Sequence, residues 1–221
     1  MKTIKDLIGT RKGEKALIIA AGSTVKYFRE DIWKFIEREA PFTIGINNIT
    51  DFFIPNYHLW TNTKRFRTFG KGIHKKSRLL LSYGIHLKTV KEVVDKREYT
   101  VINFTDMKEG IPIGYKKGKI YGFYRTAGNL SIMIAHLMGA VEINIVGMDG
   151  HTFYDYEDVK SGKKPHHCYA ENYEPFPEDI CIKKDQITNK VLKSLREYGI
   201  KFQIITPTKY EEFYDSTRLH I

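Results

Sequence analysis

The feature that most constrains the fold is an apolar run that stops abruptly at a turn. Residues Ala16–Ala21 form the run, the tripeptide Gly22-Ser23-Thr24 ends it, and apolar residues at three- and four-residue spacings follow directly. That spacing is typical of an amphipathic helix, and Thr24 is a suitable N-cap. A buried strand, a tight turn and a helix are the opening of a nucleotide-binding βαβ unit.

The alternation of strand and helix continues to the end of the chain. We expect further strands at 42–46, 57–61, 79–81, 100–103, 142–146 and 201–205, and helices at 127–139 and 186–198. The strongest apolar runs are continuous, which is typical of strands buried on both faces. We therefore predict one α/β domain spanning residues 1–221, with a Rossmann-like, mostly parallel sheet and helices on both faces. A long, mobile, irregular loop is expected at about 150–181.

Composition excludes several other classes of protein. No apolar run approaches the roughly 20 residues that a membrane span needs, and the charged N-terminus has no signal-peptide core. Cys168 and Cys181 are the only cysteines of the 221 residues, so a disulfide framework is not expected. These features favour a reducing, cytoplasmic location.

The net charge of +10 requires an explanation. Lys and Arg are spread along the chain, with clusters at Lys64–Arg67, Lys71–Arg78 and Lys116–Lys119. Positive fields attract polyanions, but a phosphate-bearing small substrate, contact with anionic lipid, or a plain solvated surface explains the charge equally well. Nucleic acid is the least favoured of these partners.

Polar residues follow several of the predicted strands, where a parallel sheet binds its ligands. Asn47 and Asn62 carry neutral amides that donate and accept together, which suits a base edge or sugar hydroxyls. Asn is also common in turns for conformational reasons. Asp149 follows another strand and could hold a ribose, hold a metal or simply form a turn.

Two helix starts face the same edge. The Gly22–Thr24 turn and the Thr126-Ala127-Gly128 segment can each bring backbone N–H groups to an anion. The alternative for the first is a tight strand–helix turn capped by Thr24, and for the second it is close helix–sheet packing through small residues. The residues that we expect to bind a nucleotide are Ala21, Gly22, Ser23, Thr24, Asn47, Asn62, Thr126, Ala127, Gly128 and Asp149.

The predicted 150–181 loop is rich in His and Tyr. His151, His166, His167 and Cys168 invite a zinc hypothesis, but their spacing matches no standard structural zinc site, so we expect no metal. A loop histidine acting as general base fits better, and the alternative is that these histidines are simply exposed to solvent in the loop. The catalytic candidates are His167, His166, Tyr154 and Tyr156, the tyrosines either contacting phosphate or pinning the loop to the domain.

The order of these motifs resembles the bacterial sialyltransferases that use CMP-sialic acid and the related motility accessory factors. The likeness runs from a small-residue loop after the first strand to a final helix, strand and proline, and it covers most of the chain. It is carried by Ala20–Thr24, Asn47, Asn62, Thr126-Ala127-Gly128, Gly147-Met148-Asp149, Phe153-Tyr154 and Asp185–Pro207.

The resemblance implies a metal-independent glycosyl transfer from a nucleotide-sugar. In those enzymes the first loop and the Asn residues grip the nucleotide, loop tyrosines hold its phosphate, and a His shortly before the last helix is the base. This chain departs at two places: Ala21 replaces the usual Asn, and Cys181–Lys184 contains no His. Either His166 or His167 substitutes from earlier in the loop, or the chemistry differs from that of the resembled enzymes.

The function expected from the sequence is therefore transfer from a nucleotide-activated donor, with a CMP-linked sugar favoured, a carbohydrate acceptor and no other cofactor. One alternative is a pterin-type diphosphokinase using ATP and Mg²⁺, which would need a carboxylate partner for Asp149. Another is a basic nucleic-acid-binding domain. The sequence also leaves open self-association and peripheral contact with a membrane.

Overall fold

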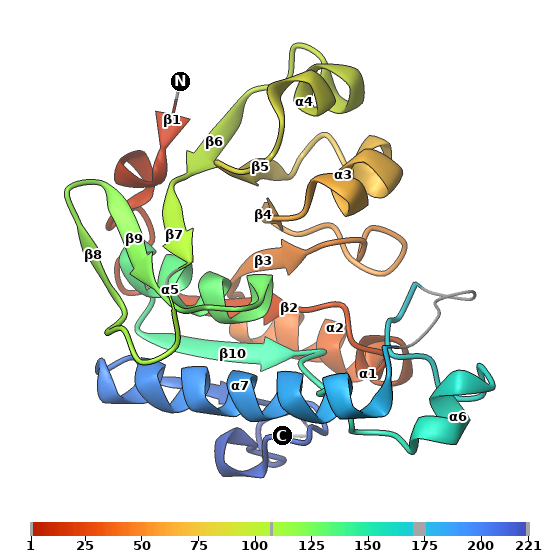
Figure 1. Ribbon diagram of the computed structural model, residues 1–221. Coiled ribbons are helices and arrows are strands. Elements are labelled where there is room, and N and C mark those ends of the chain that lie inside the picture. Colours follow the sequence, from red (N-terminus) through yellow and green to blue (C-terminus); the bar gives the residue numbers. More distant parts are fainter. Residues whose placement is uncertain (1, 107, 170–175, 220–221) are drawn as a thin grey trace.

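The central sheet of the protein is entirely parallel. The computed structural model describes residues 2–106, 108–169 and 176–219, and within them eight strands pair in the order β1-β6-β5-β4-β3-β2-β10-β11 (Figure 1). These strands are β1 (Lys2–Thr3), β2 (Lys15–Ile19), β3 (Phe42–Ile46), β4 (Tyr57–Trp60), β5 (Arg78–Ser82), β6 (Tyr99–Ile102), β10 (Glu142–Val146) and β11 (Phe202–Ile204). The predicted Rossmann-like α/β fold is confirmed.

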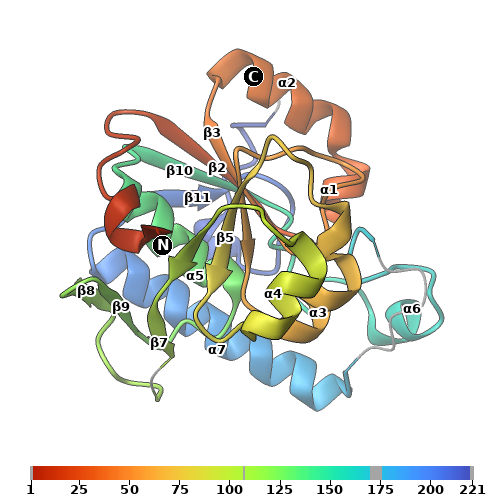
Figure 2. The same ribbon diagram turned by 90° about the horizontal axis from the view of Figure 1, so that it is seen from above.

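Helices cover both faces of this sheet (Figure 2). The described α-helices are α1 (Thr24–Tyr27), α2 (Arg29–Glu39), α3 (Thr63–Phe69), α4 (Leu87–Val94), α5 (Ala127–Met138), α6 (Tyr156–Lys160) and α7 (Glu178–Glu197), and the 3₁₀ helices are η1 (Ile4–Leu7), η2 (Gly70–Gly72) and η3 (Glu211–Phe213). Alternate residues of a strand point to opposite faces. On β2, Leu17 and Ile19 accordingly pack toward α2, whereas Ile18 belongs to the core beneath α5 and α7.

Two helices and a small sheet were not anticipated. Helices α3 and α4 pack over β4 and β5 through a separate apolar cluster centred on Trp60 and Phe66. The segment after β6 forms a second sheet, in the order β7 (Phe104–Asp106), β9 (Lys119–Gly122) and β8 (Gly114–Lys116). Both helices are only seven or eight residues long, so their hydrophobic period repeats barely twice and is hard to detect.

The prediction of an irregular loop at 150–181 was partly wrong. Helix α6 lies within it, with the Asp155 side chain accepting hydrogen bonds from the backbone N–H groups of Glu157 and Asp158. Helix α7 begins at Glu178, eight residues before the start expected for the last helix. The remainder includes residues 170–175, which lie outside the described residues.

The chain adds strands to one side of β2 first and to the other side later, so the strand order reverses between β2 and β10. From β2 the chain adds β3, β4, β5 and β6 on one side, and later places β10 and β11 on the other. The loops after β2 and β10 therefore leave in different directions, and a crevice opens between them, which is the usual ligand position in such sheets.

The two loops at this point approach each other backbone to backbone. The N–H of Gly22 donates to the carbonyl of Gly147 at 2.8 Å. A Cβ atom on Gly22 would lie 2.4 Å from that carbonyl oxygen and 2.6 Å from the Asp149 carboxyl carbon. Only glycine fits here, so the first loop needs Gly22 for packing whether or not a ligand binds.

Replacing Gly22 by alanine should therefore destabilise the fold. We expect Gly22→Ala to lower the free energy of unfolding by about 2 kcal/mol or more, since an overpacked site must shift backbone. Gly72→Ala is the matched control, because its Cβ would meet nothing closer than 3.6 Å. Urea unfolding of both variants measures the difference, and equal stabilities would contradict the assigned packing.

Candidate functional site

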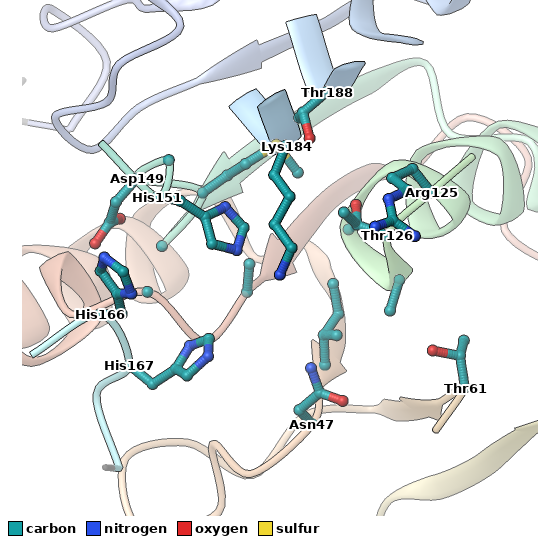
Figure 3. Close-up of a pocket in the computed structure, with 18 of the residues that line it drawn as sticks. Asn47, Thr61, Arg125, Thr126, Asp149, His151, His166, His167, Lys184 and Thr188 are labelled. Atoms are coloured by element: carbon teal, nitrogen blue, oxygen red, sulfur yellow. The ribbon is translucent and has the colours of Figure 1, made fainter. Parts of the chain in front are cut away.

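The loops at the carboxyl edge of the sheet enclose a cavity of about 350 Å³. It lies at the reversal between β2 and β10, and its size falls within the usual range of small-molecule sites. Its walls come from the ends of β2, β3, β4 and β10, the start of α5, the loop before α7, and α7 itself. The lining residues include Gly22, Asn47, Thr61, Asn62, Arg65, Arg125, Thr126, Ala127, Gly128, Asp149, His151, His166, His167, Phe176, Lys184, Thr188 and Tyr210 (Figure 3).

The strand-tip and helix-start residues predicted from the sequence meet in this cavity. Asn47, Asn62 and Thr126 all line it, although they come from separate parts of the chain. Thr126 caps α5 by accepting a hydrogen bond from the Asn129 N–H. The N–H groups of Ala127 and Gly128 belong to the first turn of α5, where the helix offers them no carbonyl partner. They are therefore available to an anion in the cavity.

Asn47 is held in an unusual conformation by a buried histidine. Its φ angle of 57° lies in the left-handed region, which Asn tolerates better than most residues. The Nε2 atom of His58, on β4, lies 2.5 Å from the Asn47 carbonyl oxygen. Burial lowers the pKa of His58 to about 4, so this ring is neutral and its Nε2–H donates. The Asn47 amide is left facing the cavity (Figure 3).

The side-chain amide of Asn62 uses its oxygen atom inside the protein and leaves its NH₂ group for a ligand. Its Oδ1 atom accepts a hydrogen bond from the Arg65 N–H at 3.0 Å and so caps α3. Its NH₂ group remains to donate to a ligand. The cap also fixes the start of α3, and thereby the direction in which the Arg65 side chain leaves the helix.

The first loop contributes less of its surface than the sequence suggested. Ser23 and Thr24 are buried, and Ala21, Ser23 and Thr24 do not line the cavity. Both hydroxyls donate to the Asp149 carboxylate, which also accepts from the Thr24 N–H at 2.9 Å. These hydroxyls are engaged inside the protein, so the loop offers a ligand mainly the backbone around Gly22.

Asp149 ties the two loops of the reversal together. Besides receiving the three hydrogen bonds from Ser23 and Thr24, it is almost fully buried, and burial raises its pKa to about 6 despite these bonds. Asp149 is the only carboxylate that lines the cavity within the part of the chain that the structure describes. In the same residues, no group of three or more His, Cys, Asp or Glu side chains is arranged to hold a metal ion.

Three cations that the sequence analysis did not single out surround the cavity. Arg65 comes from α3, Arg125 precedes α5, and Lys184 projects from α7 into the centre of the cavity (Figure 3). Burial, followed by the positive charge of Arg125, lowers the pKa of Lys184 to about 8. Its ammonium nitrogen lies 2.9 Å from the ring centroid of Phe176. Such convergent charge favours an anionic ligand, which would restore the full charge of Lys184.

His151 forms a dyad with Asp185. The Asp185 carboxylate accepts from the His151 N–H at 2.8 Å, and His151 Nδ1 lies 3.3 Å from the same oxygen. Thr152 and Tyr210 also donate to this carboxylate. A carboxylate can only accept, so the neutral form of the His151 ring would carry its proton on Nδ1 and leave the Nε2 lone pair for another partner.

His167 has a different environment. Its Nδ1 lies 3.3 Å from the Ala21 carbonyl oxygen, and its Nε2 lies 3.3 Å from an Arg65 guanidinium nitrogen. A carbonyl requires a donor and a guanidinium requires an acceptor, so both ring nitrogens are engaged. Burial, reinforced by the charge of Arg65, lowers the pKa of His167 to about 3. This ring is poorly suited to take a proton from a substrate.

The remaining catalytic candidates fall into two groups. His166 lines the cavity with its ring 5.8 Å from that of His151, and burial lowers its pKa. Tyr154 and Tyr156 do not line the cavity. Tyr154 packs against Phe153, and the Lys164 ammonium lies over its ring. Both of these contacts lie within the 150–181 segment, and they do not bring Tyr154 to the cavity.

Comparison with known protein families and with curated proteins finds no match for this chain. The site must therefore be interpreted from its own geometry.

The acid dependence of stability tests the dyad. Burial alone would raise the pKa of Asp185, but hydrogen bonds from His151 and Thr152 outweigh it and lower the pKa to about 2, from 3.8. A lowered folded-state pKa stabilises the fold above pH 4, and that stability is lost as the pH falls from about 4 to 2. Asp185→Asn should therefore cost about 2 kcal/mol at pH 7 and flatten the stability profile between pH 4 and 2. Asp179→Asn, an exposed change on the same helix, should leave the profile intact. Identical profiles for the two variants would contradict the stabilising role assigned to the hydrogen bonds of Asp185.

Proposed function

We propose that this protein is a transferase that binds a nucleotide-activated donor and passes the activated group to an acceptor hydroxyl, with glycosyl transfer as the chemistry that the sequence resemblance favours. The single observation that carries the proposal is the convergence of Arg65, Arg125, Lys184 and the start of α5 on one cavity that also contains the Asn47 and Asn62 amides. The cations and helix start suit phosphate. The amides suit a base or sugar.

The cavity supports a division of roles in the transfer. The acceptor oxygen would attack the donor carbon while its proton passes to Nε2 of His151. Asp185 would stabilise the imidazolium that forms, as in other His–Asp pairs. The bond from the donor carbon to the phosphate oxygen would break, leaving its electron pair on the nucleotide phosphate. Lys184, Arg125 and the α5 amides would stabilise that charge.

We assign the base role to His151 in place of His166 and His167. Among the cavity histidines, His151 has a hydrogen-bonded carboxylate that orients the ring and leaves Nε2 available. Lys184 lies in the stretch where the resembled enzymes carry their His, and it takes a different role here. A positive group at this position suits the leaving phosphate better than the acceptor proton.

The pterin-type diphosphokinase is less well supported. That reaction requires a Mg²⁺ site. Asp149 is the candidate carboxylate ligand, but it already accepts hydrogen bonds from Ser23 and Thr24. A measured requirement of nucleotide binding for Mg²⁺ would favour the diphosphokinase over the transferase.

The first experiment is a calorimetric binding assay with CMP, UDP, GDP and NAD. We expect one of the phosphorylated nucleosides to bind without added metal. Lys184→Ala should weaken binding at least tenfold, because it removes a charged contact worth about 1.5–3 kcal/mol, and Asn47→Ala should weaken it by about two- to tenfold, because it removes a neutral contact worth about 0.5–1.5 kcal/mol. Lys183→Ala is the control, being the exposed neighbour of Lys184. If both cavity variants bound the nucleotide with unchanged affinity, the assignment of the cavity as the nucleotide site would be wrong.

Hydrolysis of the activated donor tests the base. We expect His151→Asn to lower the turnover rate by about 10²-fold or more while nucleotide affinity changes little, because His151 acts on the attacking oxygen. His167→Asn should instead weaken nucleotide binding, since it releases Arg65. Wild-type turnover in His151→Asn would remove this residue from the mechanism.

A further inference from the structure

The positive charge of the protein is concentrated in one part of the fold. Residues 63–98 contain eleven Lys and Arg against three Asp and Glu, a net charge of +8, so the other 185 residues account for only +2 of the total of +10. We call residues 63–98 the basic lobe. It comprises α3, η2, β5 and α4, which share the apolar cluster containing Phe66, Leu81 and Val90.

Part of this charge has a role inside the domain. Arg65 faces the cavity, Arg78 donates to the Tyr57 hydroxyl, and Arg97 donates to the carbonyls of Ile73, His74 and Ser77. The lysines are different. All seven are exposed and form no ion pair within the residues that the structure describes: Lys64, Lys71, Lys75, Lys76, Lys88, Lys91 and Lys96.

The basic lobe also carries the two most exposed large apolar side chains in the described part of the chain. Tyr83 is 74% exposed and Leu87 is 67% exposed. Tyr83 lies in the turn that follows β5, and Leu87 is the first residue of α4. The Thr63 hydroxyl, at the start of α3, donates to the Gly84 carbonyl of this turn at 3.4 Å. The first turn of α3, which carries Lys64, therefore lies beside the turn that carries Tyr83 and leads into α4 at Leu87.

Helix α4 continues the same surface. Leu87 and Lys91 are four residues apart and Lys88 and Lys91 three apart, so they lie on neighbouring parts of the helix surface. Exposed aliphatic and aromatic side chains framed by lysines are typical of proteins that lie on an anionic bilayer, where apolar groups enter the acyl boundary and cations meet the headgroups. Binding to a nucleic-acid backbone uses the lysines but gives Leu87 no contact to make.

We propose that the tip of the basic lobe, formed by Lys64, Tyr83, Leu87, Lys88 and Lys91, docks the protein on the surface of an anionic lipid bilayer. Two residues of the cavity wall are tied to α3: Asn62 is its N-cap, and Arg65 lies in the helix. Docking through this tip therefore brings the cavity close to the bilayer, where an acceptor attached to lipid would be presented. Membrane contact itself does not depend on the proposed transferase function.

Each described helix is too short or too polar to cross a bilayer. The proposed attachment is peripheral, and it should respond to ionic strength because its electrostatic part is screened by salt.

Vesicle co-sedimentation of the full chain tests the proposal. We expect binding to vesicles of phosphatidylcholine mixed with phosphatidylglycerol, weak binding to phosphatidylcholine alone, and release as salt is raised. The triple variant Lys64→Gln/Lys88→Gln/Lys91→Gln should bind about 100-fold more weakly, at roughly fivefold per lysine. The double variant Tyr83→Ser/Leu87→Ser should bind at least tenfold more weakly.

The matched control is Lys116→Gln/Lys117→Gln/Lys119→Gln. It removes the same charge from exposed positions around the β8–β9 turn, and it should retain vesicle binding within about twofold. Circular dichroism melting checks that each variant is folded. Equal losses in the two triple variants would show a general charge effect and overturn the proposal. Binding to single- or double-stranded nucleic acid that exceeds vesicle binding and is unaffected by Tyr83→Ser/Leu87→Ser would also overturn it.

Discussion

The contact between the loops after β2 and β10 is the constraint from which the rest of the site follows. Gly22 and Gly147 meet backbone to backbone, and the Asp149 carboxylate fastens the start of α1 through the Thr24 N–H. This contact closes the base of the crevice at the reversal of the sheet. A side chain at Gly22 would separate the loops, and the cavity walls attached to them would move apart.

The buried carboxylates at the site stabilise the fold, whereas the groups that face the cavity include cations and neutral amides. Asp149 joins two loops, and Asp185 organises the turn containing His151 and Thr152. Because both carboxylates are engaged in these hydrogen bonds, the open space of the cavity is left to Lys184, Arg125 and Arg65. A cavity with this balance selects anions. The lowered pKa of Lys184 follows the same balance, since a bound phosphate would stabilise its charged form.

Positive charge gathers at two places, the cavity and the basic lobe, and its arrangement differs between them. Around the cavity Arg65 and Lys184 are partly buried, Arg125 is exposed, and all three line one space. On the basic lobe the lysines are exposed and spread over a surface. Converging cations bind a small anion with defined geometry, whereas diverging ones respond to an extended anionic surface. Helix α3 connects the two, because Arg65 faces inward and Lys64 outward.

Much of the fold was predictable because the signals were local. The apolar runs of β2, β3 and β10 are continuous, and α5 carries its own cap and stop signals at Thr126 and Gly139. Helices α3 and α4 escaped prediction because they are short and are stabilised by packing over β4 and β5. Helix α6 escaped because its Asp155 cap lies within a segment of irregular composition.

By itself, the sequence determined the strand–helix alternation and therefore the edge of the sheet at which Asn47, Asn62 and Thr126 lie, because in a parallel sheet every strand tip faces the same way. Only the tertiary structure decided which charged groups join them. Arg65, Arg125 and Lys184 are far apart in the chain, and their meeting depends on how α3, α5 and α7 pack. The pairing of His151 with Asp185, and the engagement of both nitrogens of His167, likewise depend on hydrogen-bond geometry between distant segments, which no local residue pattern records.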